Sequence, residues 1–170
     1  MALRNIVKTG DEVLTKMCRP VEKFDVKLWT LLDDMYETME NANGVGLAAP
    51  QVGIIRRACI VMETNVPEGE SEYFIELVNP EIIEREGEQE GGEGCLSLPE
   101  RYGAVKRPNR VKVRAQDRNG NTFEVEGTGL TARCFCHEID HLDGVLFTDR
   151  ATHMYTDEEM EELYGGDDRE

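Results

Sequence analysis

The sequence lacks several features that mark special classes of protein. No apolar run approaches the roughly 20 residues needed to cross a bilayer. The first residues, MALRNIVKTGDEV, contain no apolar core of a secretory signal. Histidine is scarce, with 3 residues in 170, and the 5 cysteines are an odd number without the spacing of a disulfide framework. We therefore expect a cytosolic protein with reduced thiols and no membrane partner.

The sequence also has few positively charged residues. The chain has 19 Lys and Arg against 35 Asp and Glu, a net charge of −16, which argues against specific binding of nucleic acid. Acidic residues gather in 84–93 and 157–170, and a basic stretch lies between them. It contains Lys106, Arg107, Arg110, Lys112, Arg114 and Arg118. We interpret the acidic segments and the basic stretch as solvated faces. Any contact with RNA should therefore be weak and sensitive to salt.

The length of 170 residues predicts a single domain over 1–170. Apolar spacing predicts a helix over 26–43, with Asp25 as its N-cap, and a second helix over 130–142. A third helix should begin at the capping-box pattern of Thr156 and stop at Gly165 and Gly166.

Residues rich in Val, Ile, Tyr and Phe predict strands between the first two helices, at 57–63, 73–79, 81–86, 110–116 and 122–126. Asn119-Gly120 indicates a hairpin, and the low-complexity stretch 86–94 predicts a mobile loop. The expected fold is α+β, with antiparallel β-sheets packed around a central metal-binding helix and with an N-terminal and a C-terminal helix.

The second predicted helix carries His137 and His141. Residues four apart project from one helix face about 6 Å along the axis, so both rings could bind one ion. Glu138 lies at the edge of this face, where a carboxylate can take a proton from water without binding the metal. The alternative is a pair of ordinary solvated or core histidines.

A catalytic ion of this kind needs a third protein ligand and an open position for water. Cys134 is on the same face, but it and His141 lie about 10.5 Å apart along the axis, too far for one helix to close the set. The third ligand should come from elsewhere. As the candidate for this third ligand, Cys95 is favoured only slightly over Cys59, His153 or an acidic residue.

The segment GVGLAAPQ (44–51) matches the dinucleotide pattern G-x-G-x-x-A literally. That pattern needs a strand before it and a helix after it, whereas here a helix precedes and Pro50 follows. Two interpretations stay open: close approach of another backbone, such as a peptide substrate, or a helix stop followed by a tightly packed strand.

Three segments together, GVGLAAPQ (44–51), EGCLS (93–97) and HEIDH (137–141), resemble the signature blocks of the peptide deformylase family, in the same order and at similar separations. The resemblance covers essentially the whole chain. It implies that one divalent ion is bound by Cys95, His137 and His141. It further implies that Glu138 is the general acid and base, and that Gln51 and the backbone N–H of Leu96 form the oxyanion hole.

The resemblance also implies a reaction and a cellular setting. The expected activity removes the N-terminal formyl group from formyl-methionyl nascent peptides in the bacterial cytoplasm, with Fe²⁺ as the native ion and Zn²⁺, Ni²⁺ or Co²⁺ possible in a purified sample. We expect a monomer and, at most, a transient ribosome contact. One departure is visible: Cys136 stands where the family commonly has Gln.

Substrate contacts are expected on two segments. Leu130, Arg133 and Cys134 precede His137 on its helix face and could form a pocket for the methionine side chain. A second set, Val45, Gly46 and Leu47, could pair with the peptide backbone as an added strand. Two rival functions remain: an H-E-x-x-H metallopeptidase, whose third ligand is His or Glu, and a structural ion with four protein ligands.

Overall fold

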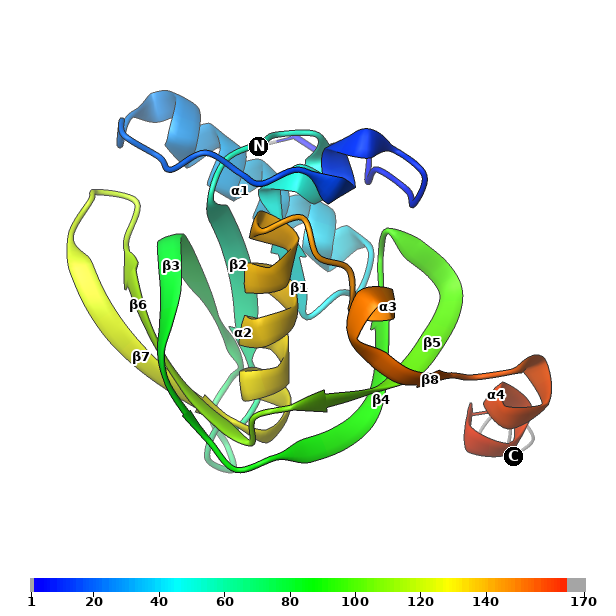
Figure 1. Ribbon diagram of the computed structural model, residues 1–170. Coiled ribbons are helices and arrows are strands. Elements are labelled where there is room, and N and C mark those ends of the chain that lie inside the picture. The colour runs from blue at the N-terminus through cyan, green and yellow to red at the C-terminus, as the bar shows by residue number, and fades with distance from the viewer. Residues whose placement is uncertain (1, 165–170) are drawn as a thin grey trace.

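Helix α2 (Gly129–Leu142) stands at the centre of the computed structural model, which describes residues 2–164 (Figure 1). Eleven of its 14 residues are buried, including both histidines. The helix is therefore a core element whose polar residues are enclosed, unlike a surface helix with one solvated face. It begins after Thr128, whose side chain makes no capping hydrogen bond.

A five-stranded antiparallel sheet wraps around one side of α2. Its strand order is β1 (Gly46–Ala48), β2 (Ala58–Glu63), β3 (Tyr73–Glu86), β6 (Arg110–Gln116) and β7 (Thr122–Thr128). β3 pairs with β2 through its first half and with β6 mainly through its second half. The register shifts at Asn79, which has a φ of 50°. This offset lets the sheet curl around the helix.

A second sheet lies on the other side of α2, in the order β4 (Gln89–Cys95), β5 (Leu98–Arg107) and β8 (Ala151–Met154). The prediction of a mobile loop over 86–94 was wrong, because β4 pairs with β5 along its whole length. Its glycines leave room for side chains from elsewhere. A Cβ on Gly91 would lie 3.2 Å from the guanidinium of Arg133, and one on Gly94 would overlap the ring of Tyr102.

The remaining helices frame these sheets. They are η1 (Glu12–Thr15), α1 (Val26–Asn41), η2 (Ala49–Val52), α3 (Phe147–Arg150) and α4 (Asp157–Tyr164). Asp25 caps α1 as expected, accepting hydrogen bonds from the N–H groups of Lys27 and Leu28. α4 projects away from the sheets (Figure 1). The predicted helix stop at Gly165 and Gly166 lies outside the described residues.

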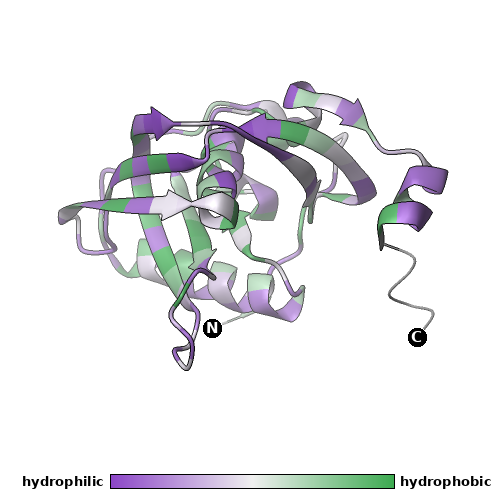
Figure 2. Cartoon of the chain, turned by 90° about the horizontal axis from the view of Figure 1, so that it is seen from below, coloured by the Kyte–Doolittle hydropathy of each residue, from purple (hydrophilic) through white to green (hydrophobic). Residues whose placement is uncertain are grey.

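The core is divided by the sheets. One apolar cluster joins α2 to the larger sheet, a second joins α1 to β1 and β2, and a small third cluster lies beneath β5 around Phe147. Along the strands, hydrophobic and hydrophilic bands alternate (Figure 2), as expected for sheets with one buried face. Within residues 2–164 no helix is long and apolar enough to cross a membrane.

The α+β architecture with a central helix is confirmed. Predicted strands 110–116, 57–63 and 122–126 are present with small changes of boundary, whereas 73–79 and 81–86 form one continuous strand. Strands β4, β5 and β8 were not predicted. A tightly packed strand after the helix stop was one of the two interpretations left open for 44–51, and β1 is that strand, with Leu47 and Ala48 buried. β1 has three residues, too few for a period of two to be detected.

Candidate metal centre and catalytic site

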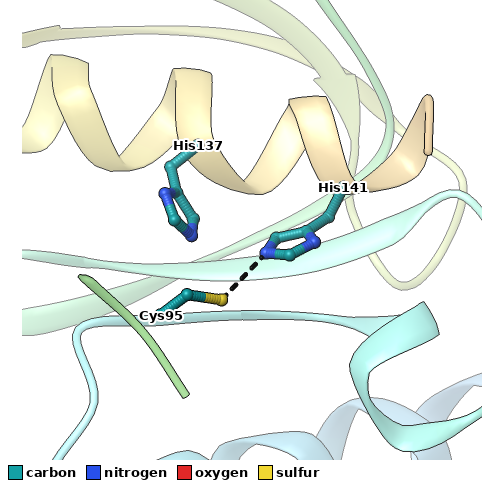
Figure 3. Close-up of side chains that lie close together, drawn as sticks. All are labelled: Cys95, His137 and His141. Atoms are coloured by element: carbon teal, nitrogen blue, oxygen red, sulfur yellow. Dashed lines mark hydrogen bonds between the residues drawn. The ribbon is translucent and has the colours of Figure 1, made fainter. Parts of the chain in front are cut away.

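Cys95 ends β4 directly opposite the histidine face of α2 (Figure 3). The ligand atoms of Cys95, His137 and His141 all lie within 4.8 Å of one another, and Sγ of Cys95 is 3.3 Å from Nε2 of His141. The spacing of four residues along the helix aligns the two rings, and their centroids are 5.0 Å apart. The cluster among residues 2–164 holds three such groups, which is the number typical of a catalytic ion.

A buried carboxylate orients the first histidine. Oε1 of Glu93 lies 2.8 Å from Nδ1 of His137, which leaves Nε2 as the ring atom available to an ion. Such carboxylate–histidine pairs fix the tautomer and the ring orientation at metal sites. Glu93 and Cys95 are two residues apart on β4, so both side chains can face α2.

Glu93 is itself held by two buried arginines. Nε of Arg107 donates to Oε2 of Glu93 at 2.8 Å, and an Nη atom of Arg133 donates to the same oxygen at 2.6 Å. Burial alone would raise the pKa of Glu93, but hydrogen bonds to Arg107 and His137 lower it to about 2. Arg107 also donates to Asp140 at 2.7 Å. The carboxylate is therefore ionised and fixed at neutral pH.

Glu138 is buried beside the ligand cluster. Oε1 of Glu138 has no hydrogen-bond partner among the described residues, and burial raises the pKa of its carboxyl to about 7. Gly46 makes room for it, since a Cβ there would lie 2.5 Å from Oε2. A carboxyl that titrates near neutral pH is well matched to proton transfer.

The two histidines differ in their electrostatic surroundings. Burial lowers the pKa of His141 well below its usual value, which favours the neutral, metal-binding form. Burial would also lower the pKa of His137, but nearby acidic groups, led by Glu138, raise it well above the usual value. This excess of negative charge around His137 favours a cation at the site.

Gln51 is fixed in orientation by its own hydrogen bonds. Its Oε1 accepts from the N–H of Ala48 at 3.0 Å. Nε2 therefore faces the cluster of Cys95, His137 and His141, lying 3.4 Å from Sγ of Cys95 and 3.2 Å from Oγ of Ser97. A fixed amide N–H beside the ligand cluster can donate to a developing oxyanion.

A cavity of about 580 Å³ opens onto Cys95, His137 and Glu138. Of the six residues expected to contact substrate, five line it: Val45, Gly46, Leu130, Arg133 and Cys134. The two residues expected to form the oxyanion hole, Gln51 and Leu96, line it as well. Leu47 does not line it, because its side chain is fully buried in the α1 cluster. The guanidinium of Arg133 is engaged by Glu93 and by the carbonyl O of Val105.

Other donors considered from the sequence lie outside the ligand cluster. Cys59 is buried in β2, and His153 is exposed, with Nε2 2.8 Å from the carboxylate of Glu159. Cys134 and Cys136 are buried in the core around α2, and burial raises their pKa values to about 12 and about 11. Cys136 therefore takes a core position beside the site.

Sequence reasoning missed the buried network in which Glu93 pairs with Arg107 and Arg133, and Arg107 pairs with Asp140. Glu93 sits in a Gly- and Glu-rich stretch with no apolar alternation, and Arg107 was counted with a solvated basic face. Arg107 is in fact only 4% exposed. The one available signal was the period of two that places Glu93 and Cys95 on one face of a strand.

Comparisons with known proteins agree with this geometry. A model of the family described as "Polypeptide deformylase" matches residues 3–157. The chain is 53% identical over 162 residues to a peptide deformylase of Caldicellulosiruptor bescii, covering 95% of this chain and 93% of that protein.

Solved structures are similar over the same range. A peptide deformylase from Legionella pneumophila superposes with a TM-score of 0.81 at 41% identity and covers 99% of both chains. A class I type b peptide deformylase from Acinetobacter baumannii with Met-Ala-Ser bound has a TM-score of 0.81 at 39% identity, covering 88% of this chain and 100% of that chain.

Proposed function

Because the chain belongs to the polypeptide deformylase family, we propose that Cys95, His137 and His141 bind its catalytic ion and that Glu138 transfers the proton. The protein is a metal-dependent hydrolase that removes the N-terminal formyl group from nascent peptides. The observation that supports the site assignment is the convergence of one thiol and two imidazoles within 4.8 Å, two of which, Cys95 and His137, line the cavity.

The donor set suits a divalent transition metal. One thiolate and two imidazoles accept Fe²⁺, Zn²⁺, Ni²⁺ or Co²⁺, and the neutral form favoured for His141 is the form that binds metal. When bound, such an ion lowers the pKa of a coordinated water and polarises a carbonyl oxygen. The third ligand separates this site from H-E-x-x-H metallopeptidases, whose third ligand is generally His or Glu.

The protein groups divide the remaining chemistry among them. Glu138, whose carboxyl pKa is raised to about 7 by burial, accepts a proton from the attacking water and later returns it to the leaving amine. Nε2 of Gln51 and the backbone N–H of Leu96 donate hydrogen bonds to the oxygen that becomes negative. Glu93 holds His137 in one tautomer throughout.

Formate release and metal content together test this assignment. Purified without oxygen, the protein should release formate from formyl-Met-Ala and none from acetyl-Met-Ala, and it should contain about one metal ion per chain. Cys95→Ala should lose most of the metal and the activity. Cys134→Ala, on the same face of α2 but outside the cluster, should keep its metal. Equal metal loss in both variants would reject Cys95 as a ligand.

Fe²⁺ is the proposed native ion. This proposal rests on the resemblance to the family. A ferrous site should lose activity in air through oxidation of the metal or of Cys95. Zn²⁺, Ni²⁺ or Co²⁺ could replace it during purification.

The methionine pocket is proposed to lie beside Leu130, at the N-terminal end of α2. Leu130 lines the catalytic cavity and is 50% exposed, so a larger side chain would intrude on the bound substrate without disturbing the core. Leu130→Trp should raise KM for formyl-Met peptides several-fold and leave kcat nearly unchanged, since it alters ground-state binding. Steady-state kinetics decide the matter, and an unchanged KM would refute the pocket assignment.

The peptide backbone is proposed to pair with the segment Val45–Leu47. β1 is an edge strand of the larger sheet, so one side of it can accept an added strand. Leu47 can contribute through its backbone alone, because its side chain is buried. The peptide bound by the Acinetobacter protein, Met-Ala-Ser, supports a peptide ligand of this kind.

A transient ribosome contact is also a proposal, and its expected basic stretch is largely neutralised. Arg110 pairs with Glu84 and Glu126, and Arg114 pairs with Glu124. Any contact through this face should therefore be weak and sensitive to salt.

We also propose that residues 1–170 form a single catalytic domain, that the protein is a monomer and that it lies in the bacterial cytoplasm. The proposal of a single domain is supported by the contacts that bring Gln51, Cys95 and His137 together from distant segments.

A further inference from the structure

Two backbone hydrogen bonds tie the N-terminal segment to the stretches that carry the proposed oxyanion donors. The N–H of Val7 donates to the carbonyl O of Gln51 at 2.7 Å, and the N–H of Thr9 donates to the carbonyl O of Ser97 at 2.8 Å. Gln51 belongs to η2, whereas Ser97 lies in the turn between β4 and β5. Segment 7–9 therefore bridges two parts of the site that are 46 residues apart in the chain.

A side chain adds a third link between the same elements. Nζ of Lys8 donates to the carbonyl O of Leu96 at 3.3 Å, and Lys8 also lines the catalytic cavity. The two bridged stretches also meet directly, since Nε2 of Gln51 donates to Oγ of Ser97 at 3.2 Å. The carbonyls on both sides of the oxyanion site are thus held by one short segment.

We propose that residues 7–9 form a positioning clamp for the oxyanion site, with Lys8 as its positioning side chain. This inference rests on the proposed function, in which Gln51 and the N–H of Leu96 bind the oxyanion. Within residues 2–164 the side chain of Lys8 forms no hydrogen bond with a proposed metal ligand or with Glu138, since its one partner is the carbonyl O of Leu96. The role of the clamp is to set the distance between the two donors.

The clamp acts on a distance to which catalysis is sensitive. Oxyanion donors must lie about 2.7–3.1 Å from the position of the developing charge, and a displacement of about 1 Å can cost roughly 100-fold in rate. Leu96 follows a proposed metal ligand, Cys95, on one side. On the other side its peptide carbonyl is held by Lys8. Without this hold, the chain after Leu96 would be fixed only at the next residue, Ser97.

Kinetics of Lys8 variants test the clamp. Lys8→Met keeps the length of the side chain and removes the donor. It should lower kcat about 5- to 20-fold, less than the roughly 100-fold cost of losing a whole oxyanion donor. KM and Tm should not change, because an exposed hydrogen bond adds little to stability. Lys8→Arg restores a donor and should return kcat to within about twofold of the unaltered protein.

Two further variants serve as references. Lys16 is an exposed lysine in the same N-terminal part of the chain, and its side chain has no partner among residues 2–164. Lys16→Met should therefore leave kcat unchanged. Gln51→Ala, in the same formate assay, reports the loss of an oxyanion donor.

The outcomes separate the clamp from the function. Full kcat in Lys8→Met beside an impaired Gln51→Ala would overturn the clamp and leave the function standing. A rise in KM alone would also overturn it, by showing that the ammonium binds substrate instead. Absence of formate release from the unaltered protein would overturn both.

Discussion

Glu138→Gln should lower kcat by about 100-fold to 10,000-fold, the range that a general acid–base group contributes. The amide has the same shape and cannot accept the proton. The fold should tolerate it, because Oε1 of Glu138 makes no hydrogen bond within the described part of the chain. Burial raises the pKa of the carboxyl to about 7, so a neutral side chain already suits this position. Formate release at saturating substrate measures the loss.

Metal content distinguishes the roles that Glu138 could have. Because Glu138 is assigned no ligand role, Glu138→Gln should retain the ion at the level of the unaltered protein. Glu124→Gln, on the exposed face of β7, controls for loss of one acidic charge and should keep full activity. If Glu138→Gln loses the metal together with turnover, Glu138 is a ligand or a structural residue and its assignment here is wrong.

Glu93→Ala should cause the largest loss of stability. It would leave Arg107 and Arg133, which are 4% and 6% exposed, without their shared carboxylate. Removing one partner of a buried ion pair costs about 3–5 kcal/mol, which for a domain of this size corresponds to a fall in Tm of roughly 6–20 °C. Thermal unfolding followed by circular dichroism measures it.

The same change should weaken metal binding. Loss of the carboxylate that orients a metal-bound histidine typically costs about 10- to 100-fold in affinity, and Glu93 makes this contact with His137. Glu84→Ala breaks an exposed ion pair with Arg110 and should not alter Tm measurably. An unchanged Tm in Glu93→Ala would show that the two arginines find other acceptors.

The helical half of the site could be predicted because its information is local. His137, Glu138 and His141 lie within one helix, whose apolar period and residue spacing are visible in five consecutive positions. Cys95 is different, since its distance from the histidines depends on how β4 packs against α2. From the residues alone it was one of several candidates, and the family resemblance singled it out.

The strand that carries Cys95 could not be predicted from its composition. β4 is rich in Gly and Glu, residues that are depleted in strands. Its glycines are required by neighbours that are remote in sequence: Arg133 lies over Gly91 and Tyr102 lies over Gly94. Because the reason for each glycine is tertiary, the stretch resembled a loop, and the role of Glu93 was missed with it.

The burial of four thiols leaves this protein with a single accessible thiol. Cys18, Cys59, Cys134 and Cys136 are enclosed, and burial raises the pKa of each. Only Cys95 is partly open to solvent. A thiol-directed alkylating agent would therefore meet one thiol, the same one proposed to bind the ion, so that chemical modification and loss of turnover would coincide.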